Sequence, residues 1–277
     1  MAGFFPAAVR ALADVVYPPV CCACAKPLDP RKNAPRTEIF PGQAARPDSE
    51  IPFAGVMAAV MCGECIRTIT PITPPMCPVC GNMFASREAE DHVCGACLEI
   101  PRRFTRARAA GAYETSLMAA VHKLKYGGKT GLAGPLGMLL LSAFAKWFDP
   151  AGVDLVVPVP LHRHKFRRRG FNQAYLLIRQ WHRQAQALGL SFDRNKITRD
   201  LLVRKVRTRS QTELSRKERL ENVKGAFALT RPEVVAGKKV LLVDDVFTTG
   251  ATAGECARTL LAGGAARVDV LTLARVN

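Results

Sequence analysis

Eight of the ten cysteines form four Cys-x-x-Cys pairs, a spacing that suits metal ligation. Two residues between the thiols let one tight turn direct both sulfurs at the same ion, and two such turns complete a tetrahedral site of four sulfurs. Four pairs therefore predict up to two structural Zn²⁺ sites, with no coordination position left open for catalysis. The predicted ligands are Cys21, Cys24, Cys62, Cys65, Cys77, Cys80, Cys94 and Cys97.

The spacing leaves the pairing of these four turns open. Sequential pairing joins the first two pairs in one site and the last two in another, and interleaved pairing satisfies the same spacing. Reduced thiols without metal, a redox role for one pair and iron–sulfur ligation are the competing interpretations. A redox pair usually lies beside a βαβ pattern, which this region lacks. Cys22 could replace Cys21 after a shift of register, whereas Cys256 is expected in the core and His92 in a loop.

A second segment, residues 240–252, has the pattern of a phosphate site. A strongly apolar run ends in two adjacent acids, and a turn rich in Thr and Gly then opens a helix. The N-terminus of a helix offers free N–H groups and a positive dipole end to a phosphate. The two carboxylates would repel that anion, so we expect them to hold neutral ribose hydroxyls, or a Mg²⁺ attached to them.

This pattern predicts a site for phosphoribosyl pyrophosphate (PRPP) or a related ribose 5-phosphate ligand. The alternative is an ordinary helix cap by Thr248 or Thr249, which does not require the acidic pair. The predicted ligand-binding residues are Asp244, Asp245, Thr248, Thr249, Gly250, Ala251 and Thr252.

Two further segments are expected to supply positive charge and a cover for this ligand. Residues 157–160, Val-Pro-Val-Pro, lead into a cationic cluster, and such charges would stabilise pyrophosphate as it departs. Residues 204–222 are expected to close over the ligand and exclude water. For each arginine the alternative is a solvated basic face or a patch that binds nucleic acid. The predicted catalytic residues are Arg163, Arg167, Arg168, Arg169 and Gln211.

The charge balance points to an anionic partner. Forty Lys and Arg against 23 Asp and Glu give a net charge of +17, and residues 162–224 alone hold 18 basic and 5 acidic side chains. Such a surface attracts nucleic acid, anionic membranes or phosphorylated small molecules. We expect no secretory signal, because the first residues have no basic n-region and Arg10 and Asp14 interrupt their apolar positions. We expect no membrane span, because the longest apolar stretches, 51–61 and 132–145, are shorter than the ~20 residues that a span needs. We therefore expect a cytoplasmic protein with reduced thiols.

From about residue 109, helical patterns alternate with short apolar runs, which predicts an α/β fold with a parallel sheet and helices on both faces. The first 103 residues are rich in Cys, Pro and Gly and lack this alternation. We therefore expect an N-terminal helix and a double metal-binding region in 1–103, and a second domain in 104–277. The predicted helices are 113–125, 132–148, 170–188, 214–223 and 251–262; the predicted strands are 154–158, 201–206, 226–229, 239–243 and 267–273.

Taken together, these segments resemble the ComF family over nearly the whole chain. The resemblance implies a type I phosphoribosyltransferase-like domain after a double zinc ribbon, PRPP bound with Mg²⁺, and a link to DNA uptake in competent bacteria. The chief departure is the 37-residue spacer between Cys24 and Cys62. No N-terminal cysteine is placed as a glutaminase nucleophile, so ammonia transfer is not implied. The matching segments are the cysteine pairs and residues 124–128, 157–160, 169–174, 211–214, 222–227 and 244–252.

Two classes of function follow from these residues. The first is a phosphoribosyltransferase that moves a 5-phosphoribosyl group from PRPP to an unidentified nucleophile and releases pyrophosphate; a PRPP sensor without turnover is its weaker variant. The second is a non-catalytic module whose basic face engages single-stranded DNA or a DNA-processing protein, since a fold does not dictate a function. The sequence leaves the acceptor, the oligomeric state and any DNA preference open.

Overall fold

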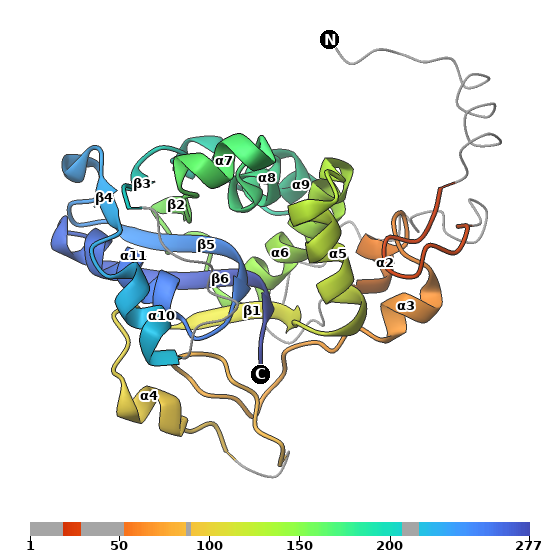
Figure 1. The fold of residues 1–277 in the computed structure, drawn as a ribbon, viewed down its shortest axis with the longest axis horizontal. Helices are drawn as coiled ribbons and strands as arrows, with labels where there is room; N and C mark the ends of the chain where they lie inside the picture. The colour runs from red at the N-terminus through yellow and green to blue at the C-terminus, as the bar shows by residue number, and fades with distance from the viewer. Residues whose placement is uncertain (1–18, 29–52, 87–89, 207–215) are drawn as a thin grey trace.

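A sheet of four parallel strands forms the centre of the computed structural model, which describes residues 19–28, 53–86, 90–206 and 216–277 (Figure 1). The predicted parallel α/β sheet is therefore confirmed. The predicted N-terminal helix and Gln211 lie outside the described residues. The strands lie in the order β1 (Ala107–Ala112), β6 (Arg267–Arg275), β5 (Lys239–Phe247) and β2 (Leu155–Pro158).

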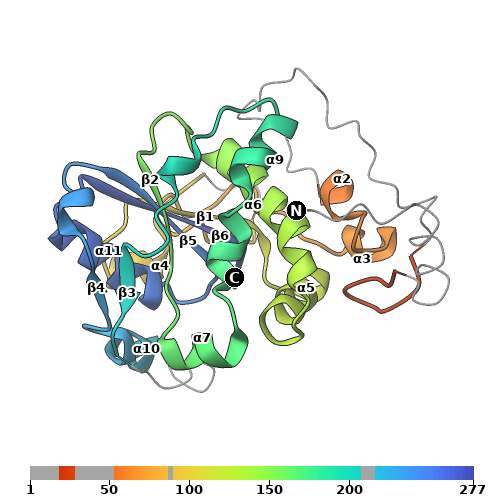
Figure 2. The same ribbon diagram turned by 90° about the horizontal axis from the view of Figure 1, so that it is seen from above.

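Both faces of this sheet are buried. In β5, Leu241 and Val243 face one apolar core, whereas Val240 and Leu242 face the other. A continuous apolar run of this kind is typical of a parallel strand covered on both sides. The first core lies under α5 (Thr115–Tyr126), α6 (Ala133–Trp147), α8 (Gln173–Ile178) and α9 (Trp181–Ala187). The second lies under α10 (Arg216–Val223), α11 (Ala251–Ala262) and the antiparallel pair β3 (Leu202–Arg204) and β4 (Phe227–Leu229), which Figure 2 shows away from α5.

Several elements differ from the expectation drawn from sequence, and one of them is β5, which continues beyond the expected end at Val243 to Phe247. The single helix expected at 170–188 is two helices, because the chain turns after α8 and lets the Trp181 indole enter the core, where its Nε1 donates to the Gly137 carbonyl oxygen at 3.1 Å. Strand β1 was not expected, and neither was α7 (Arg163–Arg169), a short helix in the cationic segment. The remaining short helices are α2 (Phe53–Met57), α3 (Gly63–Arg67), α4 (Gly95–Glu99), η1 (Thr130–Leu132), η2 (Arg194–Lys196) and η3 (Pro232–Val234).

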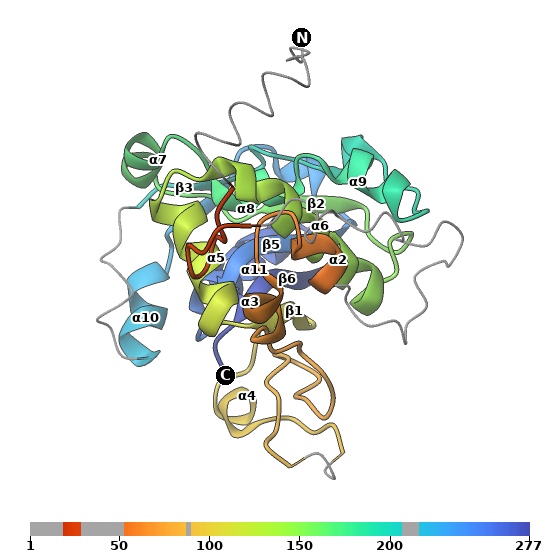
Figure 3. The same ribbon diagram turned by 90° about the vertical axis from the view of Figure 1, so that its right-hand side faces the viewer.

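The Cys-rich segments pack directly on the α/β half. Cys21 and Met57 share a core with α5 and α6, whereas Cys77 and Cys97 share a core with Phe247. Between these two regions the chain runs along the free edge of β1, and the Ala112 N–H donates to the Thr70 carbonyl oxygen at 2.8 Å. The edge strand is thus covered, as exposed sheet edges usually are. Figure 3 shows the loop around α4 on the far side of β1 from α5.

The domain boundary expected after residue 103 stays a prediction.

Among the described residues, no helix combines the length and the apolar character that a membrane crossing would need.

Candidate functional site

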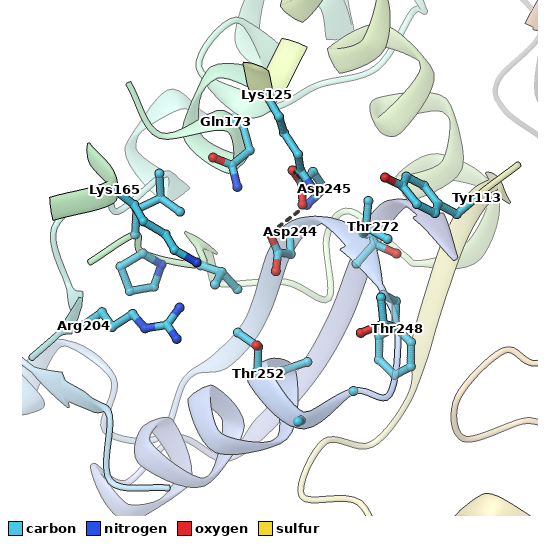
Figure 4. A pocket seen from close by; sticks show the side chains of 18 of the residues that line it. Tyr113, Lys125, Lys165, Gln173, Arg204, Asp244, Asp245, Thr248, Thr252 and Thr272 are labelled. Carbon is cyan, nitrogen blue, oxygen red and sulfur yellow. Dashed lines mark hydrogen bonds and ion pairs between the residues drawn. The ribbon is translucent and has the colours of Figure 1, made fainter. Parts of the chain in front are cut away.

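A cavity of about 340 Å³ lies at the carboxyl ends of β2 and β5. Val243 of β5 pairs with Pro158 of β2, so the loop after β2 and the acidic pair after Val243 reach the same edge of the sheet. Ligands of open α/β sheets bind at this edge. Figure 4 shows Asp244 and Asp245 at the centre of the cavity, between Lys165 on one side and Thr248 on the other.

Asp245 is buried and forms an ion pair with a lysine. The Lys125 Nζ lies 2.9 Å from the Asp245 Oδ2, and only 3% of Asp245 is exposed. Burial by itself would lower the pKa of Lys125, but the Asp245 carboxylate outweighs it and raises that pKa. Lys125 therefore stays charged and compensates the buried carboxylate. No role for Lys125 is predicted from the sequence, although it lies in segment 124–128 of the family resemblance.

Asp244 is the partly exposed member of the acidic pair and faces the cavity. Its surroundings exclude water and, together with the neighbouring Asp245 carboxylate, raise the pKa of Asp244 to about 8. Its Oδ1 accepts a hydrogen bond from the Asp245 N–H at 2.8 Å. A carboxyl group in this state can exchange hydrogen bonds with the hydroxyl groups of a sugar, and a nearby cation would favour its charged form.

Residues 248–252, here called the Thr-Gly turn, connect β5 to the N-terminus of α11. Gly250 is the N-cap of α11 and has φ +77°, and a Cβ at this position would lie 2.6 Å from the Phe247 Cζ. Glycine is therefore required for the turn to pass this ring. Thr248, Ala251 and Thr252 line the cavity together with Gly250. Thr249 directs its carbonyl oxygen to Arg102, whose Nη1 donates to it at 2.8 Å.

The structure contains only a weak form of the expected cap by Thr248 or Thr249. The N-cap residue is Gly250, which has no side chain that could cap α11. The Thr249 Oγ1 accepts a long hydrogen bond, 3.4 Å, from the Ala251 N–H. The N-cap and the first residues of this 12-residue helix thus line the cavity without a side-chain cap from the N-cap residue. This arrangement can receive an anion.

Cations line the side of the cavity opposite the Thr-Gly turn. Lys165 and Arg169 are four residues apart in α7 and both line the cavity, as do Arg204 and Arg219. Burial lowers the pKa of Lys165, and Arg204 and Arg169 lower it further, as expected where positive charges crowd. A group of phosphates would relieve this repulsion. The sequence predicted Arg169 here but missed Lys165, because α7 was not expected to be a helix.

The other predicted catalytic residues lie elsewhere. Arg163, Arg167 and Arg168 are exposed on α7 and do not line the cavity. The role proposed for them in pyrophosphate release stays a prediction, as does that of Gln211, which lies outside the described residues.

Aromatic side chains line the cavity beside α5, and no pattern in the sequence predicts them. The ring centroids of Tyr113 and His122 are 6.2 Å apart, and those of His122 and Tyr126 are 5.6 Å apart. The Arg169 guanidinium lies over the Tyr126 ring at 5.3 Å. Surfaces of this kind suit a planar or cationic group.

The eight paired cysteines form two clusters, each with all sulfurs within 4.8 Å of one another. The first cluster consists of Cys21, Cys24, Cys62 and Cys65, and the second of Cys77, Cys80, Cys94 and Cys97. The geometry thus selects the sequential pairing over the interleaved one. Cys22 lies outside both clusters, and burial raises the pKa of its thiol to about 11. His92 stacks on Phe84, with ring centroids 3.8 Å apart, and is not among the clustered residues.

The donor set of each cluster fits a tetrahedral zinc ion. Zn–S bonds near ~2.3 Å place tetrahedral sulfurs roughly 3.8 Å apart. The Sγ atoms of Cys24 and Cys62 are 3.8 Å apart, and those of Cys80 and Cys94 are 3.6 Å apart. Burial would raise the pKa of Cys21, but backbone N–H groups outweigh it and lower that pKa to about 6. Such groups also favour the thiolate form that binds metal.

Comparison with known proteins matches both halves of the chain. Residues 54–98 match a double zinc ribbon domain, and residues 168–277 match a phosphoribosyl transferase domain. The chain is 37% identical over 218 residues to the DNA utilization protein YhgH of Salmonella typhimurium. It is 29% identical to Competence protein F of Haemophilus influenzae and 28% identical to Competence protein ComFC of Bacillus subtilis. These alignments cover 78% of this chain and 90%, 90% and 84% of the three relatives.

Replacing Asp244 by Asn should change how stability depends on pH. Because the native state raises the pKa of Asp244 to about 8, it holds this proton more tightly than the unfolded chain does. The wild type therefore loses stability as the pH rises from about 4 to about 8, a loss that Asp244→Asn lacks. In urea unfolding without ligand or Mg²⁺, the variant should gain on the order of 4 kcal/mol over the wild type between about pH 5 and about pH 9, since each of the roughly three pH units from pH 5 to the native pKa contributes about 1.4 kcal/mol.

The control is Asp200→Asn, which removes an exposed carboxylate and should show no such gain. A difference between Asp244→Asn and the wild type that does not depend on pH would contradict the raised pKa.

Proposed function

The chain belongs to the ComF family, and we propose that its cavity binds PRPP with Mg²⁺ and transfers or senses the 5-phosphoribosyl group. One observation carries this proposal. An acidic pair and a helix N-terminus line the same cavity, although a site for a simple anion would have no use for carboxylates. A ribose 5-phosphate unit has both the hydroxyls that the acids can bind and the phosphate that the turn can bind.

In this proposal the Thr-Gly turn receives the 5-phosphate. Thr248, Ala251 and Thr252 line the cavity, and their backbone N–H groups and the threonine hydroxyls would bind that group. Asp244 binds the ribose hydroxyls, while Lys125 forms an ion pair with Asp245 beside it. The cationic side of the cavity, with Lys165 and Arg169, then binds the pyrophosphate.

Transfer would break the bond between C1 of the ribose and the pyrophosphate oxygen. The electron pair would leave with pyrophosphate, whose charge Lys165, Arg169 and Arg204 would stabilise, and the acceptor would donate a new pair to C1 and release a proton to solvent. Mg²⁺ held near the acidic pair would supply further positive charge. Arg163, Arg167 and Arg168 would assist that departure from outside the cavity, Gln211 would be a further catalytic residue, and segment 204–222 would exclude water. A sensor would use the same contacts without an acceptor.

We further propose that each cysteine cluster holds one structural Zn²⁺. Four thiols fill a tetrahedral site and leave no position for a substrate, so the ions would stabilise the fold rather than catalyse. All ten cysteines are free thiols in the structure, which fits a reducing compartment, and we propose that the chain works in the cytoplasm. We also propose that it consists of two domains, 1–103 and 104–277.

A second candidate function is the binding of single-stranded DNA or a DNA-processing protein, separately from the cavity. The exposed arginines of α7, Arg163, Arg167 and Arg168, favour it, because they present positive charge to solvent where no described acid neutralises them. The names of two relatives, DNA utilization protein and Competence protein, agree with a role near DNA.

Removing both carboxylates should abolish PRPP binding. The double variant Asp244→Asn, Asp245→Asn cannot accept the charge-assisted hydrogen bonds that ribose hydroxyls donate, and each is worth about 1.5–3 kcal/mol. Calorimetry with PRPP and Mg²⁺ should show affinity reduced by about a hundredfold or more. The exposed variant Asp200→Asn should bind as the wild type does, and an unchanged affinity of the double variant would refute the proposed site.

The purified chain should contain two zinc ions, one for each cluster. Cys62→Ser and Cys94→Ser should each lower the zinc content to one ion, because each removes one of four ligands from a different cluster. Cys256→Ala, which removes a thiol outside both clusters, should keep both ions. Elemental analysis gives the content, and metal-free protein with eight freely titrating paired thiols would contradict the proposal.

If α7 binds DNA, replacing its exposed arginines should reduce the salt dependence of that binding. The slope of log K against log salt for single strands is about 0.7 per phosphate contact, so Arg163→Gln, Arg167→Gln, Arg168→Gln should lower it by about 2. Fluorescence anisotropy with an oligothymidine probe measures the slope. The matched control replaces Arg231, Lys238 and Lys239, which are exposed and lie near the amino end of β5. Equal losses in the two triple variants would exclude a specific role for α7.

A further inference from the structure

The second cysteine cluster is connected to the Thr-Gly turn by Arg102. This residue follows α4 and extends to the end of β5, where its Nη1 donates to the Thr249 carbonyl oxygen at 2.8 Å. The charge of the same guanidinium group acts on Cys97, one of the four clustered thiols, and opposes the effect of burial on the pKa of that thiol. Arg102 therefore combines a hydrogen bond to the backbone of the turn with a charge interaction with the cluster.

Arg275 makes a second connection from the last strand. Its Nη1 donates to the Cys80 carbonyl oxygen at 2.6 Å, and its Nη2 lies 3.6 Å from the Cys80 Sγ. Its guanidinium also lies over the Phe247 ring at 5.0 Å, and that ring packs under Gly250, where a Cβ would lie 2.6 Å from it. The path thus runs from Cys80 through two packed side chains to the N-cap of α11.

Charge explains why two arginines lie at this place. Four thiolates around one Zn²⁺ carry a net charge of about −2, which two guanidinium groups balance. Only 6% of Arg275 is exposed, and a buried cation requires a compensating charge. None of the ion pairs among the described residues involves Arg102 or Arg275, so the cluster is the negative group that they contact.

We propose that Arg102 and Arg275 are positioning residues that couple metal occupancy of the second cluster to phosphoester binding at the Thr-Gly turn. The inference rests on the proposed function of that turn. Metal bonds hold Cys80 and Cys97 in place, and these two residues hold the arginines. Loss of the ion removes this geometry and the charge that faces the guanidinium groups, so the turn loses its anchor at Thr249. Coupling of binding is reciprocal, so a bound phosphoester also strengthens metal binding.

The first cluster provides an internal comparison. It packs against α5 and α6, on the other side of the sheet from α11. Cys62 and Cys94 are matched residues, because each is the third ligand of its cluster and the N-cap of a five-residue helix. Loss of metal at Cys62 should therefore leave the turn intact, whereas loss at Cys94 should not.

The first test uses ribose 5-phosphate as the probe and the full chain loaded with zinc. Calorimetry should show that Cys94→Ser weakens its binding about tenfold, as loss of a charge-assisted anchor implies, and that Cys62→Ser changes it less than twofold. Circular dichroism and the zinc content of each variant verify that the remaining cluster is folded.

The second test does not require removal of a ligand. In protein loaded with Co²⁺ instead of zinc, ribose 5-phosphate should shift the visible cobalt–thiolate absorption of the wild type. It should not shift that of Arg102→Gln, whereas Arg102→Lys, which keeps the charge, should restore part of the shift. Arg103→Gln, the same change at the exposed neighbouring residue, should behave like the wild type.

The two possible failures can be distinguished. If ribose 5-phosphate does not bind the wild-type chain, the proposed function fails and the inference fails with it. If it binds and Cys62→Ser and Cys94→Ser weaken it equally, or if Arg102→Gln keeps the cobalt shift, only the coupling is overturned.

Discussion

Two adjacent carboxylates lie at the end of a buried strand, beside a turn that can receive an anion, and this conflict of charge governs the cavity. Lys125 compensates Asp245 at 2.9 Å, whereas burial, and after it the neighbouring Asp245 carboxylate, raises the pKa of Asp244. Burial of one carboxylate is thus possible only because α5 delivers a cation to it. The second carboxyl is left facing the cavity, where a ligand with hydroxyl groups can bind it.

The Cys-rich segments contribute to this arrangement from both sides of the sheet. The first cluster packs on α5, the helix that carries Lys125, and the second lies against the Thr-Gly turn. If the second cluster holds metal, as proposed, its bonds would add to apolar burial in fixing the loop beside the turn before α11.

The parts of this structure that the sequence predicted are those encoded locally. The apolar run of β5, the acidic pair and the Thr-Gly turn are contiguous, and cysteine spacing alone groups eight thiols. Strand β1 was missed because Ala and Gly give no strand signal, and its conformation depends on pairing with β6 and with residues 70–72. The break before Trp181 depends on a core contact with α6. Lys125 and Arg102 act across the fold, so no local pattern marks them.

The division of α7 into two faces would allow one basic segment to bind the two anionic partners proposed above. Lys165 and Arg169, four residues apart, face the cavity, whereas Arg163, Arg167 and Arg168 face solvent. A phosphorylated small molecule and a nucleic acid would thus contact different faces of one helix. The two partners would still influence each other through the electrostatic potential. The two faces of a helix are separated by about its diameter of 10 Å, which is close to the Debye length of about 8 Å at physiological salt. A polyanion on the outer face would lower the potential that attracts phosphates to the inner one, and added salt would weaken that competition.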